Sequence, residues 1–148
     1  MALAELLTKE QVLLDIEANS KEDCINQLID VFVKQGVVHD ANAYKAAVIA
    51  REEEGTTGIG FSVAIPHGKS DGVSKPGLAF ARVTKGLDWE SLDGSPVHLV
   101  FLIAVPETHA GDEHLRILSQ LSRKLMHDDF REKLMTTNST DELIQSLE

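Results

Sequence analysis

Residues 97–105, VHLVFLIAV, decide the fold because nearly every side chain in this run is apolar. A strand that is hydrophobic on both faces is typical of the centre of a sheet covered on both sides. Residues 77–83 (GLAFARV) predict a second strand, and residues 11–16 (QVLLDI) predict a short first strand. Residues 63–67 (VAIPH) predict another short strand, which we expect to end at Pro66 because proline has no N–H.

Helices are predicted between and after these strands. Apolar residues after Ser20 recur at i, i+3, i+4, i+7 and i+8, with Ser20 as N-cap and Gly36 at the end. Asp40 is a candidate cap for a second helix, near whose end we expect the acidic residues 52–54 to be solvated. A third helix is expected from about residues 111–112 to 126, followed by short helices over 130–135 and after a capping box at 139–142.

These elements predict one layered α/β domain over residues 1–148, with a mixed sheet. The net charge of −10 argues against nucleic acid and anionic membranes as partners, and suits docking onto a basic patch of another protein. No apolar run approaches the roughly 20 residues that cross a bilayer, and the start lacks a signal-peptide pattern. With one cysteine, Cys24, which we expect to be buried, the cytoplasm is the expected compartment.

His67 is the first candidate for chemistry. Neutral imidazole is a good nucleophile near neutral pH, and His67 follows an apolar strand and precedes Gly68, which would permit an abrupt turn. His114 falls in the first turn of the third helix, where a histidine can donate a hydrogen bond to an anion. Each histidine also has a structural alternative, His67 as a strand-end residue and His114 as a helix cap.

Other classes of site find less support. None of the six histidines forms an HxH or HExxH motif, and His109 and His114 have poor ligand spacing, so no metal is expected. The glycine-rich residues 55–60 match neither a Walker A loop nor a dinucleotide fingerprint, and no cofactor is expected. A metal-dependent hydrolase remains an alternative that measured bound metal would test.

Two motifs then carry a resemblance. Arg51-Glu-Glu-Glu-Gly-Thr-Thr-Gly-Ile-Gly60 and Ala64-Ile-Pro-His-Gly68 resemble the signature of the fructose/mannitol-type Enzyme IIA domain of the sugar phosphotransferase system. Glu113-His114-Leu115 extends the match, which covers nearly the whole chain. The resemblance implies a mixed, roughly five-stranded sheet flanked by helices.

The resemblance also implies a function. His67 would accept a phosphoryl group from the phosphohistidine of an HPr-type carrier and pass it to the cysteine of an Enzyme IIB component. His114 and Arg51 would stabilise the charge of the phosphoryl group, and a backbone carbonyl should hold the second ring nitrogen of His67. Further candidates are donors to the phosphoryl group at Thr56, Thr57 and Gly58, and docking residues Ile59 and Phe61, for which core packing is the alternative.

Position 61 bears on the branch of the family. The mannitol branch usually has a Glu six residues before the active histidine, and Phe61 at this position favours the fructose branch. Ser62 stands where many fructose members have Gly. The alternative function within the same fold is a nitrogen-type regulatory Enzyme IIA, which signals by binding target proteins.

Overall fold

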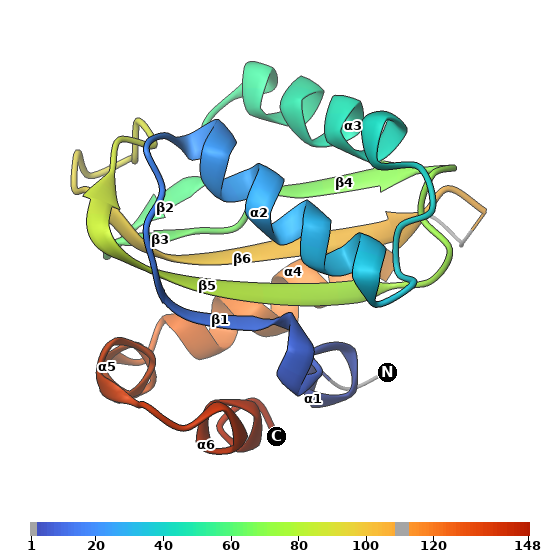
Figure 1. The fold of residues 1–148 in the computed structure, drawn as a ribbon. Coiled ribbons are helices and arrows are strands. Elements are labelled where there is room, and N and C mark those ends of the chain that lie inside the picture. Colours follow the sequence, from blue (N-terminus) through green and yellow to red (C-terminus); the bar gives the residue numbers. More distant parts are fainter. Residues whose placement is uncertain (1–2, 109–112) are drawn as a thin grey trace.

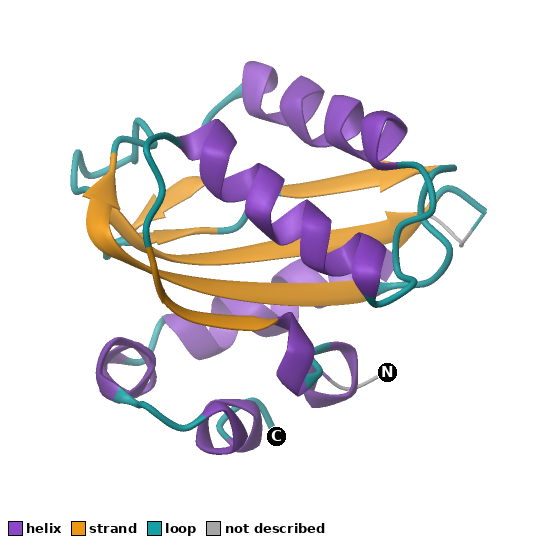
Figure 2. Cartoon of the chain, viewed as in Figure 1, coloured by secondary structure: helices purple, strands orange, loops and turns teal. Residues whose placement is uncertain are grey.

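The computed structural model describes residues 3–108 and 113–148, apart from the side chains of Glu113 and His114. One mixed sheet lies between two layers of helices (Figures 1 and 2). Helices α2 and α3 cover one face of the sheet, and α1, α4, α5 and α6 lie on the other (Figure 1). The strands are β1 (Val12–Ile16), β2 (Gly58–Gly60), β3 (Val63–Ala64), β4 (His67–Ser70), β5 (Gly77–Leu87) and β6 (Val97–Pro106). The helices are α1 (Leu3–Leu6), the 3-10 helix η1 (Lys9–Gln11), α2 (Lys21–Lys34), α3 (Ala41–Glu54), α4 (Glu113–Leu125), α5 (Asp128–Thr136) and α6 (Thr140–Gln145).

Strand β6 is the centre of the sheet, as its apolar sequence predicts. The strand order is β1-β5-β6-β3-β2, and β4 also pairs with β6. Strand β5 runs antiparallel to β6, whereas β3 and β4 run parallel to it. The register does not shift between the pairs Val63↔Leu99 and His67↔Ile103. Strands β3 and β4 are therefore two halves of one strand path, interrupted at Ile65 and Pro66.

The pleat of β6 divides the core into two clusters. Val100, Leu102 and Ala104 pack with α2 and α3, whereas Phe101 and Ile103 pack with α4 and its neighbours on the opposite face. Side chains of paired residues in adjacent strands point to the same face. Since His67 pairs with Ile103, the imidazole of His67 lies on the α4 face of the sheet.

The predicted helix caps are confirmed. The side chain of Ser20 accepts a hydrogen bond from the Asp23 amide at 3.0 Å, and Asp40 accepts one from the Ala43 amide at 3.1 Å. Ser139 accepts from the Glu142 amide at 3.1 Å and starts α6. The expected mixed α/β sheet is also confirmed, whereas α1, η1 and β2 were not predicted. In the described part of the chain, no helix is both long and apolar enough to cross a lipid bilayer.

The structure corrects two predictions around Pro66. His67 begins β4 instead of ending a strand, because the strand path resumes after the interruption. Gly68 lies inside β4 and makes no turn. A Cβ at Gly68 would lie 2.9 Å from Val48 Cγ2 and 3.2 Å from Tyr44 Cε1, which are closer than ordinary contacts. The glycine is needed because α3 packs directly on β4.

Arg82 joins the C-terminal helices to the sheet. This residue of β5 is only 6% exposed, and its guanidinium donates to Asp15 Oδ1 at 2.8 Å and to Oδ2 at 2.9 Å. Its Nη1 donates to the carbonyls of Leu134 at 3.1 Å and Thr137 at 2.6 Å, at the end of α5. The hydrogen bond and charge of Arg82 lower the pKa of Asp15 below its usual range.

Arg82→Met should lower the free energy of unfolding by about 2 to 4 kcal/mol, because two carbonyls at the end of α5 lose their donor. Urea denaturation followed by circular dichroism measures the change. Asp15→Asn is the control and should cost less, because the side chain of Asp15 is largely exposed. Equal stability of Arg82→Met and the wild type would contradict the structural role of Arg82.

Candidate functional site

The ring of His67 is held by a backbone carbonyl. Its Nδ1 lies 3.1 Å from the carbonyl oxygen of Ile65, which confirms the partner expected for one ring nitrogen. A carbonyl oxygen only accepts hydrogen bonds, so Nδ1 carries the proton in the neutral ring. The lone pair of the neutral ring is then on Nε2. His67 is half-buried, so the residue is held by its surroundings while part of it reaches solvent.

The peptide units around Pro66 are held from both sides. The amide of Ile65 donates to the Thr57 carbonyl at 3.0 Å on the outer side of the strand path. On the inner side, the Pro66 carbonyl accepts from the Ile103 amide at 3.1 Å. The buried Tyr44 hydroxyl donates to the Ile103 carbonyl at 2.6 Å and ties α3 to the same point of β6. The strand carrying His67 is thus fixed although its pairing is interrupted.

The hydroxyls of Thr56 and Thr57 already make hydrogen bonds within the protein. The Thr56 hydroxyl donates to the Trp89 carbonyl at 2.5 Å and accepts from the Gly58 amide at 3.0 Å. The Thr57 hydroxyl donates to a carboxylate oxygen of Glu52 and accepts from Trp89 Nε1 at 3.0 Å. A hydroxyl has one hydrogen to donate, so in this arrangement both threonines are already committed.

Glu52 departs from the expectation for residues 52–54. Its side chain is buried, whereas Glu53 and Glu54 are exposed as predicted. Besides the bond from Thr57, its Oε1 lies 3.5 Å from Nζ of Lys21 on α2. Burial of a carboxylate is unfavourable unless a cation or donors compensate. Here Thr57 donates to Oε2, whereas Oε1 has Lys21 nearby but no hydrogen-bond partner among the described residues. Sequence analysis missed the hydrogen bonds of Glu52 and Trp89 to Thr57, because no local sequence pattern predicts that these residues are buried together.

Arg51 and His114 lie on helices of opposite layers, α3 and α4. Arg51 lies in the last turn of α3, where its Nη1 donates to the Gly55 carbonyl at 2.8 Å, beside the segment that holds Ile65. His114 is the second residue of α4, the helix on the face toward which His67 points. The side chain of His114 lies outside the described residues, as does His109.

The two docking candidates differ in exposure. Ile59 is half-buried and packs against the core cluster of α4, which matches its core-packing alternative. Phe61 is 58% exposed at the turn between β2 and β3, where its φ is +57°. Its amide donates to Asp93 Oδ2 at 3.0 Å, and the Arg131 guanidinium carbon lies 4.1 Å from the centroid of its ring. Hydrogen bonds from Ser95 and from the Phe61 amide lower the pKa of Asp93 to about 2.

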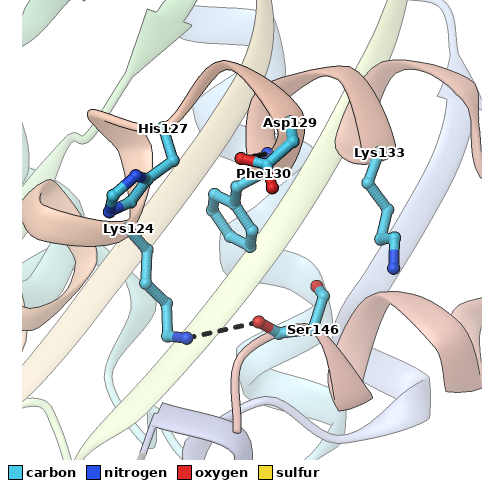
Figure 3. A pocket seen from close by; sticks show the side chains of 6 residues that line it. All are labelled: Lys124, His127, Asp129, Phe130, Lys133 and Ser146. Carbon is cyan, nitrogen blue, oxygen red and sulfur yellow. Dashed lines mark hydrogen bonds between the residues drawn. The ribbon is translucent and has the colours of Figure 1, made fainter.

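A pocket of about 470 Å³ lies between α4, α5 and α6 (Figure 3). Its lining side chains are Lys124, His127, Asp129, Phe130, Lys133 and Ser146. Lys124 Nζ already donates to the carbonyls of Ser146 and Glu148, each at 3.3 Å, and thereby connects α4 to the end of the chain. Among the predicted site residues whose side chains the structure describes, none lines this pocket.

Comparison with known proteins identifies the family. A family model described as "Phosphoenolpyruvate-dependent sugar phosphotransferase system, EIIA 2" matches residues 5–148. The chain belongs to this family. As an EIIA domain it is a component of a phosphotransferase, and the resemblance stated from the motifs is confirmed.

Two EIIA relatives are named for fructose. The fructose-specific EIIABC component of Bacillus subtilis is 45% identical over 144 residues, which are 97% of this chain and 22% of that protein. The fructose-specific EIIA component of Haloferax volcanii is 47% identical over 130 residues, which are 88% of this chain and 84% of that protein. The chain thus spans about a fifth of the first relative and most of the second.

Solved EIIA structures share the fold. The nitrogen regulatory protein IIA-Ntr of Neisseria meningitidis has a TM-score of 0.90 at 34% identity, with 98% of each chain covered. Enzyme IIA of mannitol from Escherichia coli, solved in complex with phosphorylated enzyme IIB, has a TM-score of 0.81 at 28% identity, with 96% of this chain and 98% of that chain covered. EIIA domains therefore pair with EIIB domains, and the family includes both sugar-specific and regulatory members.

Cys24 should be inert in the native protein. Its side chain is fully buried, and burial, with a smaller contribution from Asp23, raises the pKa of its thiol to about 12. At pH 8 we expect Ellman's reagent to react with the native thiol at least about 10²-fold more slowly than with the urea-unfolded chain, because only the thiolate attacks. Equal rates in the two states would contradict the burial of Cys24.

Proposed function

We propose that this EIIA domain carries a phosphoryl group on Nε2 of His67. The observation that carries the proposal is the hydrogen bond between Nδ1 of His67 and the Ile65 carbonyl, which leaves the lone pair of the neutral ring on Nε2. In the proposed step, Nε2 attacks the phosphorus of a phosphohistidine on an HPr-type carrier. The N–P bond of the carrier breaks as the new N–P bond forms, and the carrier regains a neutral imidazole.

The Ile65 carbonyl supports the step beyond orientation. Phosphorylation of Nε2 gives the imidazole ring positive character, and this raises the strength of the hydrogen bond from Nδ1–H to the carbonyl oxygen. The same bond holds the ring in place, so little reorganisation accompanies transfer. Arg51 and His114 are the proposed stabilisers of the negative charge on the phosphoryl oxygens, a role that matches the electrostatic demands of phosphoryl transfer.

The proposed acceptor is the cysteine of an Enzyme IIB component. The phosphoryl group leaves Nε2 of His67 for the thiolate, and the imidazole returns to its neutral form. A fructose-type permease is the proposed setting, supported by the two fructose-specific relatives at 45% and 47% identity. The reaction needs only proteins of the phosphotransferase system, without a metal or other cofactor, and we propose the cytoplasm as its location.

A regulatory function is the second candidate. It is supported by the likeness to IIA-Ntr of Neisseria meningitidis, at a TM-score of 0.90 and 34% identity. Both functions use the same phosphohistidine chemistry. They differ in the protein that the phosphorylated domain binds next, an EIIB component or a regulatory target. Phosphoryl transfer to a purified fructose-type EIIB within seconds would favour the transport function. Failure to transfer, together with tight binding to a regulatory target, would favour signalling.

His67→Ala should abolish phosphorylation, because it removes the nucleophile. Incubation with phosphoenolpyruvate, Enzyme I and HPr should label the wild type with acid-labile, base-stable phosphate and leave the variant unlabelled. His98→Ala is a matched control, because Nδ1 of His98 also contacts a backbone carbonyl, that of Val83, at 3.0 Å. The control should label like the wild type, and a labelled His67→Ala would overturn the proposal.

His114→Ala should slow phosphoryl transfer by roughly 10²-fold, the usual effect of losing one preorganised donor. The fold should persist, as judged by circular dichroism and by the urea midpoint. Rapid-quench kinetics with phosphorylated HPr measure the rate, and His127→Ala, at the start of α5, serves as a control. Unchanged kinetics in His114→Ala would assign His114 a structural role instead.

A further inference from the structure

A continuous path of hydrogen bonds runs from a buried carboxylate to the ring of His67. The Thr57 hydroxyl donates to Glu52 Oε2, and the Thr57 carbonyl accepts from the Ile65 amide at 3.0 Å. The Ile65 carbonyl in turn accepts from Nδ1 of His67 at 3.1 Å. Three hydrogen bonds therefore connect the end of α3 to the imidazole. They are joined to one another through the covalent bonds of Thr57 and Ile65.

The carboxylate end of this path is rigidly placed. Glu52 lies in the last turn of α3 and is only 9% exposed, with Lys21 Nζ of α2 at 3.5 Å from its Oε1. Trp89, which is fully buried, donates from Nε1 to the Thr57 hydroxyl at 3.0 Å. Thr57 is thereby fixed by an acceptor on one helix and a donor on the loop after β5. Its main-chain carbonyl has little freedom to move.

The ring end of the path depends on this support. Ile65 and Pro66 lie outside the strands that pair with β6, and Pro66 has no amide hydrogen to add a bond there. The bond from the Ile65 amide to Thr57 therefore restrains the Ala64–Ile65 peptide, which directly precedes the peptide whose carbonyl contacts His67. If the Thr57 carbonyl shifts, the Ile65 unit can turn, and its carbonyl no longer points at Nδ1 of His67.

We infer that Glu52 is a positioning residue for His67, which selects the ring tautomer with Nδ1 protonated by fixing Thr57 and, through it, the Ile65 carbonyl. This inference rests on the proposed phosphorylation of His67. Glu52 contacts no reacting atom on this view and acts only through the two intermediate residues. Stability alone is a weak reason for such a network, because buried charged groups often stabilise no more than apolar residues of similar size.

The decisive measurement is the tautomer of His67, recorded without any phosphoryl donor. Two-bond ¹H–¹⁵N correlation spectra of the ring distinguish Nδ1–H from Nε2–H in the ¹⁵N-labelled protein. In Glu52→Ala we expect a mixture of both tautomers and a rate of phosphorylation by phosphorylated HPr at least about 10-fold lower, since misplaced reacting groups lose rates of this order. Glu52→Gln keeps an acceptor oxygen for Thr57 and should restore the single tautomer and most of the rate.

Glu53→Ala is the matched control, because it removes the same side chain one residue along the helix from an exposed position. It should keep both the wild-type ring spectrum and the wild-type rate. The indole resonance of Trp89, the single tryptophan, reports independently whether the bond to Thr57 is lost. It should shift in Glu52→Ala and stay in place in Glu53→Ala.

Several outcomes would overturn the inference. Identical ring spectra in Glu52→Ala and Glu53→Ala would do so, even if the former were slower, because a lower rate alone fits a generally loosened fold. If Glu52→Ala does not fold, Thr57→Val and Thr57→Ser provide the same comparison, with the hydroxyl removed or retained, and equal spectra in these two would again overturn it. A wild type that takes no phosphate at His67 would refute the proposed function, while the ring spectra would still decide the positioning role.

Discussion

Pro66 has no amide hydrogen, and the strand path that carries His67 is interrupted there while keeping its register against β6. Much of the site follows from this interruption. The Ile65 carbonyl is released from regular pairing and can accept from the imidazole two residues later. The neighbouring bonds from Ile103 and Ile65 then hold the interruption in one conformation. In a regular strand the Ile65 carbonyl would not be available to the His67 ring. A longer loop would not hold that carbonyl in place.

The two faces of the sheet differ around the interruption at Pro66. On one face α3 packs directly on β4 at Gly68. On the same face the Tyr44 hydroxyl of α3 donates a hydrogen bond to the Ile103 carbonyl. On the opposite face the imidazole of His67 points toward the layer of α4. Packing on the first face thus fixes the backbone, which leaves the second face available for chemistry.

The sequence predicted the features that local patterns encode. The apolar residues of β6, the caps at Ser20, Asp40 and Ser139, and a backbone carbonyl as partner of the His67 ring could all be inferred from the sequence. Features that depend on contacts between distant parts of the chain were not predicted. In the sequence Gly68 resembles a turn residue, but in the structure it allows α3 to pack on β4. Glu52 resembles its exposed neighbours in the sequence, but in the structure it is buried against Thr57, which also bonds to Trp89.

The buried guanidinium of Arg82 has a consequence for how the molecule opens. It holds two carbonyls at the C-terminal end of α5 from within the sheet, so that end of the helix cannot detach without stranding a cation in the core. Local fraying there is therefore suppressed, although the helix lies on the outside of the layer. The last helical turns and the middle of β5 form one cooperative unit, whose amides exchange with solvent together.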